Sequence, residues 1–211
     1  MSPAPLQPGD LPESTSALAR ALIGCIVVRD GREGRTSGRI VETEAYRPGD
    51  SAAHAFRGKR VANASLFLPA FHAYVYLSHG VAWCFNVVAE RGDVGAGVLI
   101  RALEPLEGID RMRARRDGAA LRDLCRGPGR LSRALDIDRS LDGVYLLSHG
   151  PLWLAAPDRP RPRVAAGPRI GLTRAAALRA RYYESGSPYV SGPARLRLPA
   201  RAPKDQSRRT T

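Results

Sequence analysis

Two glutamates and a tyrosine stand at alternate positions in one short segment, as Glu42, Glu44 and Tyr46. Alternate side chains of a strand share a face, so the two carboxylates point the same way. Such a pair repels unless a cation, a base or water lies between its members. One glutamate can then act as a general base that activates water. The alternative is a solvent-facing strand edge with two solvated glutamates, and Tyr46 can equally pack in the core with its hydroxyl outward.

A second group of residues is suited to holding a planar ligand. Tyr74 and Tyr76 alternate along an apolar segment, where they can sandwich a nucleobase or form an aromatic core. His54 follows small residues in a polar loop and can approach such a ligand, or be a surface histidine. Asn86 interrupts an apolar run, so it is either a satisfied buried amide or a reader of base edges.

The turn Ser78-His79-Gly80 separates two apolar segments and predicts a hairpin with His79 at its tip. A hairpin tip flanked by aromatic residues can enter a DNA groove as a wedge. Metal chemistry is less favoured: Glu42, Glu44, His54 and His72 match no metal-binding spacing, so we expect no metal and no cofactor.

The charge of the chain favours a polyanionic partner. Its 211 residues carry a formal net charge of +13 and a sequence pI of about 10.7, which indicates nucleic acid first and a membrane surface second. Base composition of the gene can favour arginine over lysine, but it does not create a net excess. Arginines crowd residues 111–133 and form either a DNA-backbone face or a plain solvated surface. They are Arg111, Arg113, Arg115, Arg116, Arg122, Arg126, Arg130 and Arg133.

Composition also limits the class of protein. Cys25, Cys84 and Cys125 are too widely spaced to suggest a zinc site or a disulfide framework. We see no apolar run of membrane-spanning length and no signal peptide at Met1. We therefore expect a cytoplasmic protein, nucleoid-associated if bacterial, with no membrane partner.

The pattern of elements predicts an α+β fold in a single domain. Strands and helices are mixed without regular alternation. We expect a flexible tail over residues 1–13, one domain over 14–194 and a basic tail over 195–211. The segments fall into three kinds. Strands are predicted at 25–29, 39–45, 73–77, 81–88, 95–103 and within 144–154; helices at 18–23, 106–116, 119–135 and 172–181; exposed loops at 47–63 and 156–169.

Several short segments of the sequence resemble one family, the alkyladenine (3-methyladenine) DNA glycosylases of the mammalian type. The resemblance runs in the family's order from Leu18 to Ser191. Its segments are Arg-Ile-Val-Glu-Thr-Glu-Ala-Tyr (39–46), Ala-Ala-His (52–54), Tyr-Val-Tyr (74–76), Arg-Ala-Leu-Glu-Pro-Leu-Glu-Gly (101–108), Gly-Pro-Gly-Arg-Leu (127–131) and Gly-Ser-Pro-Tyr-Val-Ser (186–191).

The resemblance implies a curled, mainly antiparallel sheet, surrounding helices and a hairpin that intercalates in the DNA minor groove. It implies a monofunctional enzyme that flips a damaged purine out of double-stranded DNA and hydrolyses its N-glycosidic bond. Candidate substrates are 3-methyladenine and 7-methylguanine, with hypoxanthine and ethenoadenine as further ones. A monomer is the default, since the basic surface must reach DNA.

The resemblance also implies a role for each site residue. Glu44 is the general base, which strand periodicity alone does not distinguish from Glu42. The resemblance assigns base binding to Tyr46, His54, Tyr76 and Asn86. It assigns the flipped nucleotide's phosphate or the catalytic water to Arg101. The wedge of the hairpin falls to His79, Val81 and Leu99.

One departure from the family is His79, which stands where a tyrosine is usual at the hairpin tip. Histidine is smaller, so we expect a weaker wedge. Two other functions stay open: a lesion-binding protein without catalysis, and a metal-dependent nuclease that uses Glu42, Glu44 and His54.

Overall fold

The computed structural model describes residues 4–193, so the predicted basic tail at 195–211 lies outside the described residues. Eight strands form one sheet in which every pairing is antiparallel. The strands are β1 (Ile26–Gly31), β2 (Gly34–Tyr46), β3 (Ala73–Ser78), β4 (Ala82–Val88), β5 (Gly97–Glu107), β6 (Leu152–Ala155), β7 (Val164–Gly167) and β8 (Arg181–Glu184). The α-helices are α1 (Thr15–Ala21), α2 (Ile109–Arg115) and α3 (Pro128–Leu135), and the 3-10 helices are η1 (His54–Arg57), η2 (Val61–Phe67), η3 (Leu121–Asp123) and η4 (Arg139–Leu141). The predicted α+β fold with a curled antiparallel sheet is confirmed.

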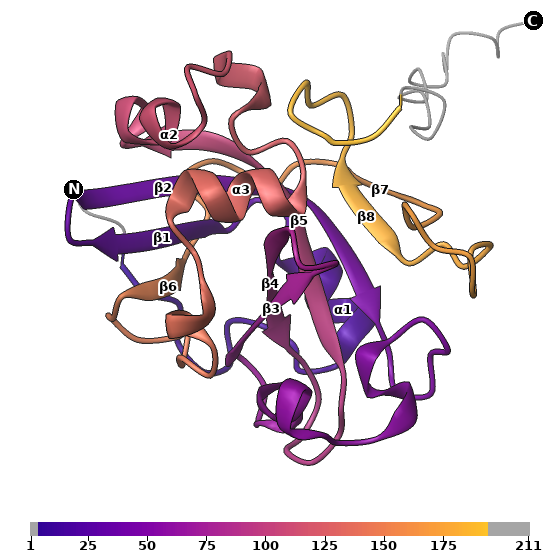
Figure 1. The fold of residues 1–211 in the computed structure, drawn as a ribbon. Helices are drawn as coiled ribbons and strands as arrows, with labels where there is room; N and C mark the ends of the chain where they lie inside the picture. The colour runs from indigo at the N-terminus through magenta and orange to yellow at the C-terminus, as the bar shows by residue number, and fades with distance from the viewer. Residues whose placement is uncertain (1–3, 194–211) are drawn as a thin grey trace, which may run out of the picture.

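Strand β2 lies at the centre of the fold. The sheet runs β3-β4-β5-β2-β1-β6, and β8 also pairs with β2 and carries β7 with it (Figure 1). The register between β2 and β5 shifts around residues 40–43, where β8 joins the same part of β2. A strand with neighbours on both edges and packing on both faces is buried throughout its middle, as residues 36–45 are. The predicted strand at 39–45 is therefore buried over its whole length.

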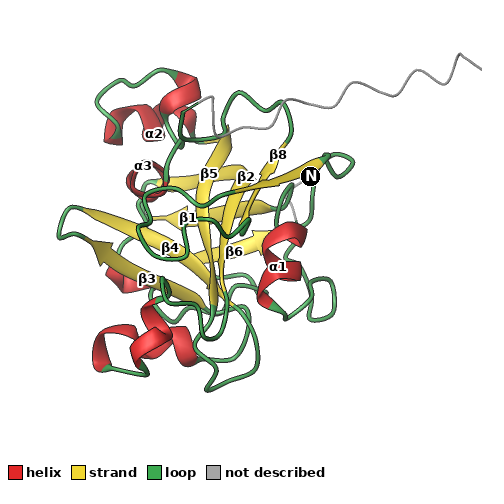
Figure 2. Ribbon diagram, turned by 90° about the vertical axis from the view of Figure 1, so that its right-hand side faces the viewer, coloured by secondary structure: helices red, strands yellow, loops and turns green. Residues whose placement is uncertain are grey.

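Helices cover the sheet from opposite sides. Figure 2 shows α1 on one side and α3 on the other, with the β3–β4 hairpin projecting on the side of α3. Helix α3 begins at Gly127-Pro128, where proline suits a first helical position because it lacks an N–H. It buries Leu131 and Leu135 in the main hydrophobic core. The predicted helix at 119–135 is thus divided into η3 and the separate helix α3.

The predicted helix at 172–181 is absent. Residues 171–180 form bends and turns, and the chain then enters β8. Arg169 and Arg181, at the two ends of this segment, are both fully buried in ion pairs. These tertiary contacts hold the segment across the sheet and override the helical propensity of its alanines and leucines. Strand β7 also lies where the sequence predicted only an exposed loop.

Pro105 belongs to a strand rather than to the first turn of a helix. Strand β5 continues to Glu107, and Gly108 precedes α2 with a φ of 74°. Pro105 pairs with Gly38 beside an irregularity in the register. Proline is tolerated there because a bulge leaves a backbone N–H outside the ladder.

The N-terminal segment is packed where the sequence predicted a flexible tail. Leu6 and Leu11 are each only 4% exposed and belong to the main core. The Leu6 N–H donates to the Leu154 carbonyl, which attaches the segment to β6. Leu6 and Leu11 therefore attach this segment to the core, and the domain boundary at residue 14 stays a prediction.

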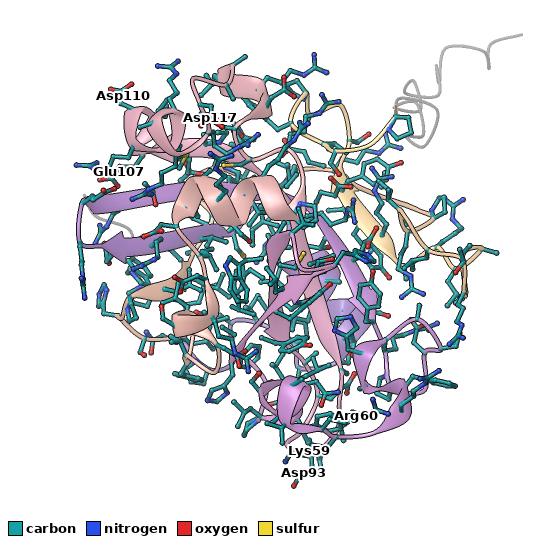
Figure 3. The ribbon with its side chains drawn as sticks, in the orientation of Figure 1. Lys59, Arg60, Asp93, Glu107, Asp110 and Asp117 are labelled. Carbon is teal, nitrogen blue, oxygen red and sulfur yellow. The ribbon has the colours of Figure 1, made fainter. Side chains whose placement is uncertain are left out.

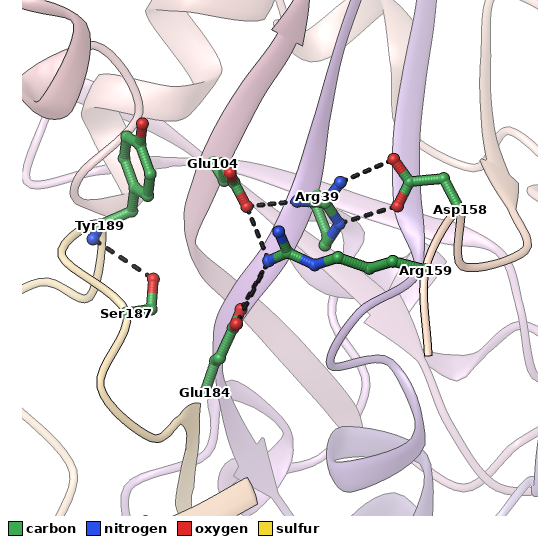
Figure 4. Close-up of polar contacts among 7 residues, drawn as sticks. All are labelled: Arg39, Glu104, Asp158, Arg159, Glu184, Ser187 and Tyr189. Atoms are coloured by element: carbon green, nitrogen blue, oxygen red, sulfur yellow. Dashed lines mark hydrogen bonds and ion pairs between the residues drawn. The ribbon is translucent and has the colours of Figure 1, made fainter. Parts of the chain in front are cut away.

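An ion-pair network fastens the predicted 156–169 loop to the sheet. Arg39 on β2 contacts Asp158 and Glu104, and Arg159 contacts Glu104 and Glu184 (Figure 4). Arg39 is 4% exposed, so its charge depends on these carboxylates for the interactions that water would otherwise provide. The network joins β2, β5 and β8 through residues other than those that contact Glu44.

The three cysteines are buried and free. Burial raises the pKa of the Cys25 thiol to about 11 and that of Cys125 to about 12. Burial likewise raises the pKa of Cys84. Within residues 4–193, no helix has the length and apolarity needed to cross a bilayer.

Candidate active site

A cavity of about 320 Å³ opens between the β3–β4 hairpin, strand β5 and the loop that follows β7. This volume is within the roughly 300–1,000 Å³ typical of small-molecule sites. Most of the predicted site residues line it. They are Tyr46, His54, Tyr76, His79, Asn86, Leu99 and Arg101. Residues predicted from separate segments of the sequence therefore meet at one cavity.

Glu44 lies immediately behind the wall of this cavity and has no exposed surface. Its Oε1 accepts from the Ile170 N–H at 2.8 Å, and its Oε2 accepts from the Tyr46 hydroxyl at 2.9 Å. Arg101 Nη1 lies 3.2 Å from the same Oε2. All three partners line the cavity, so they separate the carboxylate from it.

The environment of Glu44 suits a proton acceptor. Burial is the largest influence and raises the pKa of the carboxyl, whereas Arg101, the Ile170 N–H and the Tyr46 hydroxyl oppose it. A carboxylate with a raised pKa is a stronger base, provided that it stays ionised at the working pH. The partners that lower the pKa keep the ionised form populated.

Glu42 has a different environment, which distinguishes the two carboxylates that strand periodicity did not. It is also fully buried, but its Oε1 accepts from Arg181 Nε at 2.6 Å and its Oε2 accepts from the Ser191 N–H at 2.7 Å. Neither of these partners lines the cavity. Of the two, Glu44 is the carboxylate whose two hydrogen-bond donors both line the cavity, and neither is the solvated surface glutamate that the sequence also allowed.

A cation does lie between the two carboxylates. Arg101 on β5 is 8% exposed, with its Nε 3.4 Å from Glu42 Oε1 and its Nη1 3.2 Å from Glu44 Oε2. The repulsion expected between two carboxylates on one face is thus relieved by a guanidinium. Arg101 reaches the cavity as predicted, and its role towards phosphate or water stays a prediction.

Tyr46 is held in place by a buried ion pair that sequence reasoning missed. The Arg169 guanidinium lies 4.6 Å from the ring centroid of Tyr46 and donates to both Asp50 and the Ala45 carbonyl. Burial, followed by the charge of Glu44, raises the pKa of Tyr46. The phenol therefore stays protonated and remains a donor to Glu44. No local pattern marks Arg169, which is 123 positions from Tyr46 along the chain.

Aromatic rings form one wall of the cavity. The rings of Tyr74 and Tyr76 are stacked with centroids 5.3 Å apart, and the ring of His54 meets Tyr76 edge-on at 4.3 Å. His54 Nδ1 is hydrogen-bonded to the Tyr74 hydroxyl at 2.9 Å. Burial lowers the pKa of His54, so the ring is neutral at pH 7. The wall is uncharged and planar, which suits the face of a heterocycle.

Asn86 is 6% exposed on β4, and its Nδ2 donates to the Tyr74 carbonyl at 3.0 Å. This bond fixes the amide at the cavity wall. Leu99 pairs with Asn86 across β4 and β5 and is 5% exposed. Leu99 also lines the cavity, and its share in the wedge stays a prediction.

The predicted hairpin is present, with His79, Gly80 and Val81 at its tip between β3 and β4. The Val81 N–H donates to the Ser78 carbonyl at 2.9 Å. Val81 is 84% exposed, and His79 is exposed while also lining the cavity. The tip thus lies at the mouth of the cavity, and its intercalation in DNA stays a prediction.

Many arginines of the 111–133 segment hold the structure together instead of forming a free basic face. Arg116, Arg122 and Arg126 donate to main-chain carbonyls, and Arg115 contacts both Glu33 and the Ala134 carbonyl. Arg130 on α3 is more accessible, with half of its side chain exposed. The segment is therefore neither a DNA-backbone face nor a plain solvated surface throughout its length.

Lys59 lies away from the cavity. It contacts Asp93 at 3.5 Å on the surface, and Figure 3 shows both residues beside Arg60 at one edge of the molecule. Lys59 does not line the cavity. Within residues 4–193, no cluster of three or more histidine, cysteine, aspartate or glutamate side chains has the arrangement of a metal site.

Comparison with known proteins decides the family. Residues 10–188 match the model of the family described as methylpurine-DNA glycosylase. The chain belongs to the methylpurine-DNA glycosylase family. This membership confirms the resemblance drawn from the sequence and makes the chain a DNA glycosylase of alkylated purines in base-excision repair.

Bacterial relatives cover nearly the whole chain, and each is named "Putative 3-methyladenine DNA glycosylase". The protein of Mesorhizobium japonicum is 56% identical over 91% of this chain and 92% of its own length. That of Paraburkholderia phytofirmans is 50% identical over 91% of this chain and 90% of its own. That of Rubrobacter xylanophilus is 47% identical over 83% of this chain and 91% of its own.

Proposed function

We propose that this glycosylase flips an alkylated purine out of double-stranded DNA and releases it by hydrolysis, with Glu44 as the general base. The observation that carries the proposal is the position of Glu44, a buried carboxylate whose hydrogen-bond partners line an aromatic cavity. The neutral wall formed by the rings of His54, Tyr74 and Tyr76 offers a planar base aromatic surfaces on which to stack.

The bond changes follow from the chemistry of alkylated purines. Alkylation places positive charge on the ring, so the base leaves C1′ with the electron pair of the glycosidic bond and becomes neutral. Water attacks C1′ and passes its proton to Glu44, and the products are the free base and an abasic sugar. The carboxylate also stabilises the positive charge that develops on the sugar.

Glu44 must reach a water molecule to act as a base, although the carboxylate lies behind the cavity wall. Tyr46, Arg101 and the Ile170 N–H stand between the carboxylate and the cavity. Arg101 is the one of the three that a second anion can attract. A phosphate of the flipped nucleotide turns Arg101 Nη1 from Oε2 and leaves that oxygen free to receive a proton, while Arg101 Nε stays beside Glu42 Oε1.

The duplex is proposed to lie across the mouth of the cavity. The exposed tip formed by His79 and Val81 fills the gap that the flipped base leaves. Exposed arginines such as Arg130 on α3 and Arg139 near the hairpin face the DNA backbone. A monomer suffices for this arrangement, since one chain carries both the hairpin and the cavity.

Substrates are proposed from the chemistry of the cavity. A neutral aromatic wall accepts the electron-poor rings of 3-methyladenine and 7-methylguanine, and it can also stack on hypoxanthine or ethenoadenine. Asn86 crowds the position of a purine 2-amino group and so disfavours guanine. 7-Methylguanine carries the same group but is released because its positive charge, which undamaged guanine lacks, weakens the glycosidic bond. Selectivity also comes from the lower cost of unstacking damaged bases.

Replacing Glu44 by glutamine tests the proposal. Glutamine keeps the shape, and its amide oxygen can still accept from the Ile170 N–H, but the side chain no longer takes up a proton, so we expect base release to fall by roughly 10²–10⁴-fold. The measurement is release of 3-methyladenine and 7-methylguanine from a methylated duplex, in EDTA, under single-turnover conditions. Undiminished release by E44Q would refute the assignment of the base.

Two controls separate the competing functions. Lys59→Ala should release bases at the wild-type rate and leave abasic sites, because water rather than an amine attacks C1′. Binding to the lesion without release by the wild type would instead indicate a lesion-binding protein. Strand scission that EDTA abolishes would indicate the metal-dependent nuclease.

A further inference from the structure

Four buried charges form a continuous row across strands β8, β2 and β5. Arg181 Nε lies 2.6 Å from Glu42 Oε1, and Arg101 Nε lies 3.4 Å from the same oxygen. Arg101 Nη1 then reaches Glu44 Oε2 at 3.2 Å. Arg181, Glu42 and Glu44 have no exposed side-chain surface, and Arg101 has 10%. We call this row of Arg181, Glu42, Arg101 and Glu44 the charge row.

Glu42 is the member that joins the two halves of the charge row. Its Oε1 is shared by two guanidinium groups, and its Oε2 accepts from the Ser191 N–H. Arg181 Nη2 in turn donates to the Ser191 carbonyl at 3.1 Å. Strand β8 and the segment at Ser191 therefore fix the Glu42 carboxylate, which faces one edge of Arg101 in an ion pair at 3.4 Å without a hydrogen bond to Arg101 Nε.

We propose that Glu42 is a positioning residue for hydrolysis, which holds Arg101 beside Glu44 and balances its charge so that Glu44 remains a strong base. This inference rests on the proposed role of Glu44. It adds a residue that touches neither the cavity nor a substrate, and so acts only through Arg101.

Charge balance is the physical reason. The row contains two cations and two anions, which sum to zero in a region that excludes water. Buried charges interact strongly because little water screens them. Without the negative charge of Glu42, the Arg101 guanidinium acts on Glu44 with no second carboxylate beside it. The ionised form of Glu44 is then over-stabilised, which lowers its affinity for a proton and weakens it as a base.

The other charged and titratable groups near Glu44 do not replace this effect. Tyr46 on the same strand donates to the carboxylate and stays neutral. Tyr76 on β3 is also neutral, because burial raises its pKa. Arg169 lies over the Tyr46 ring, with its charge matched by Asp50. Glu42 is therefore the only anion near Glu44 that offsets Arg101 within the described residues.

The test is the pH dependence of single-turnover release of 7-methylguanine by Glu42→Gln. Glutamine preserves the size of the side chain and removes its charge. We expect the acid limb of the rate profile to move to lower pH by about half a unit or more, and the plateau rate to fall by roughly threefold to tenfold. A variant that merely loosened the fold would lose rate at every pH without moving the limb.

Glu104→Gln is the matched control. Glu104 is a carboxylate of β5 that pairs with Arg39 and Arg159 outside the charge row (Figure 4). The same chemical change there should leave the acid limb at its wild-type position. Movement of the limb by E104Q as large as that by E42Q would overturn the specific role of Glu42.

A second variant covers the case in which E42Q does not fold. Glu42→Asp keeps the charge but withdraws it from Arg101, so we expect an unmoved acid limb and a reduced plateau rate with unchanged affinity for the lesion duplex. A wild-type plateau rate in E42D would overturn the proposal. So would an E42Q profile that coincides with that of the wild type.

The Glu44→Gln variant, measured beside these, separates the two proposals. If E44Q retains release, the proposed base is wrong, and the role of Glu42 fails with it. If E44Q loses release while E42Q behaves as the wild type, only the role of Glu42 is wrong.

Discussion

At the scale of single residues, the main result is that the proposed base is not part of the cavity surface. Glu44 is enclosed by the same three groups that fix its orientation. Such enclosure keeps bulk water from the carboxylate and makes its protonation depend on a few named contacts. The two side-chain contacts, from Tyr46 and Arg101, can each be removed by one substitution, and the direction of the effect can be stated in advance.

Tyr46→Phe removes the hydroxyl that donates to Glu44 and keeps the ring against Arg169. The hydroxyl stabilises the ionised carboxylate, so its loss raises the pKa of Glu44. The acid limb of the pH–rate profile for base release should therefore move to higher pH, opposite to the change expected for E42Q.

The matched control for this prediction is Tyr145→Phe, since the Tyr145 ring contacts His72 rather than Glu44. Its profile should coincide with that of the wild type. An acid limb of Y46F that stays in place, or moves to lower pH, would mean that the Tyr46 hydroxyl does not stabilise the carboxylate.

Local sequence patterns identified the residues that line the cavity but not those that hold them. The alternation of side chains along a strand placed Glu42 and Glu44 on one face. The segments that resemble the family selected Tyr46, His54, Tyr76, Asn86 and Arg101. The supporting residues Arg169 and Arg181 come from a loop and a short strand far along the chain. Their function depends on which strands meet in space, and no window of the sequence contains that information.

At the scale of elements, the β3–β4 hairpin joins the cavity to the surface. Tyr74 and Tyr76 line the cavity from β3, and three residues later the chain reaches the exposed tip. His79 has a φ of 50°. The left-handed region is uncommon for residues other than glycine, and histidine is among those that enter it more readily. The turn and the cavity wall are thus parts of one rigid pair of strands.

His79→Tyr tests the wedge. A tyrosine has a larger face for stacking, which should outweigh some added strain in the turn and tighten binding to a lesion duplex by about threefold to tenfold. The measurement is the Kd for a duplex with one lesion, compared with the undamaged duplex of the same sequence. Equal tightening for both duplexes, or weaker binding to the lesion, would count against intercalation.

Elements were predicted well where burial follows a simple rule. The strands at 39–45, 73–77 and 81–88 were found because buried strands have apolar or alternating sequences. The predicted helix at 172–181 was wrong because its ends are set by buried arginines, and β7 was missed because its four residues are too short for a periodic signal. Strand β5 runs through Pro105, since a local bulge removes the usual objection to proline.

At the scale of the whole molecule, the N-terminal segment closes the core. Leu6 and Leu11 pack with residues of α1, β1 and β6 in the main hydrophobic cluster. The segment therefore contributes to stability, although none of residues 4–13 lines the cavity.

Leu11→Ala measures that contribution. Removal of a buried leucine side chain costs about 2–5 kcal/mol in the free energy of unfolding, so the urea midpoint should fall markedly. Leu121→Ala, at a position that is 36% exposed, should change it by less than about 1 kcal/mol. Equal stability of L11A and the wild type would show that the segment is not packed in solution.

The buried thiols have a consequence for a protein that repairs alkylated DNA. Methylating agents attack nucleophiles, and the nucleophilic form of cysteine is the thiolate. Cys25, Cys84 and Cys125 are enclosed, and their raised pKa keeps them as thiols at neutral pH. Even Cys84, at the cavity wall, presents a protonated sulfur. These three cysteines therefore offer little thiolate to the alkylating agents that create the enzyme's substrates.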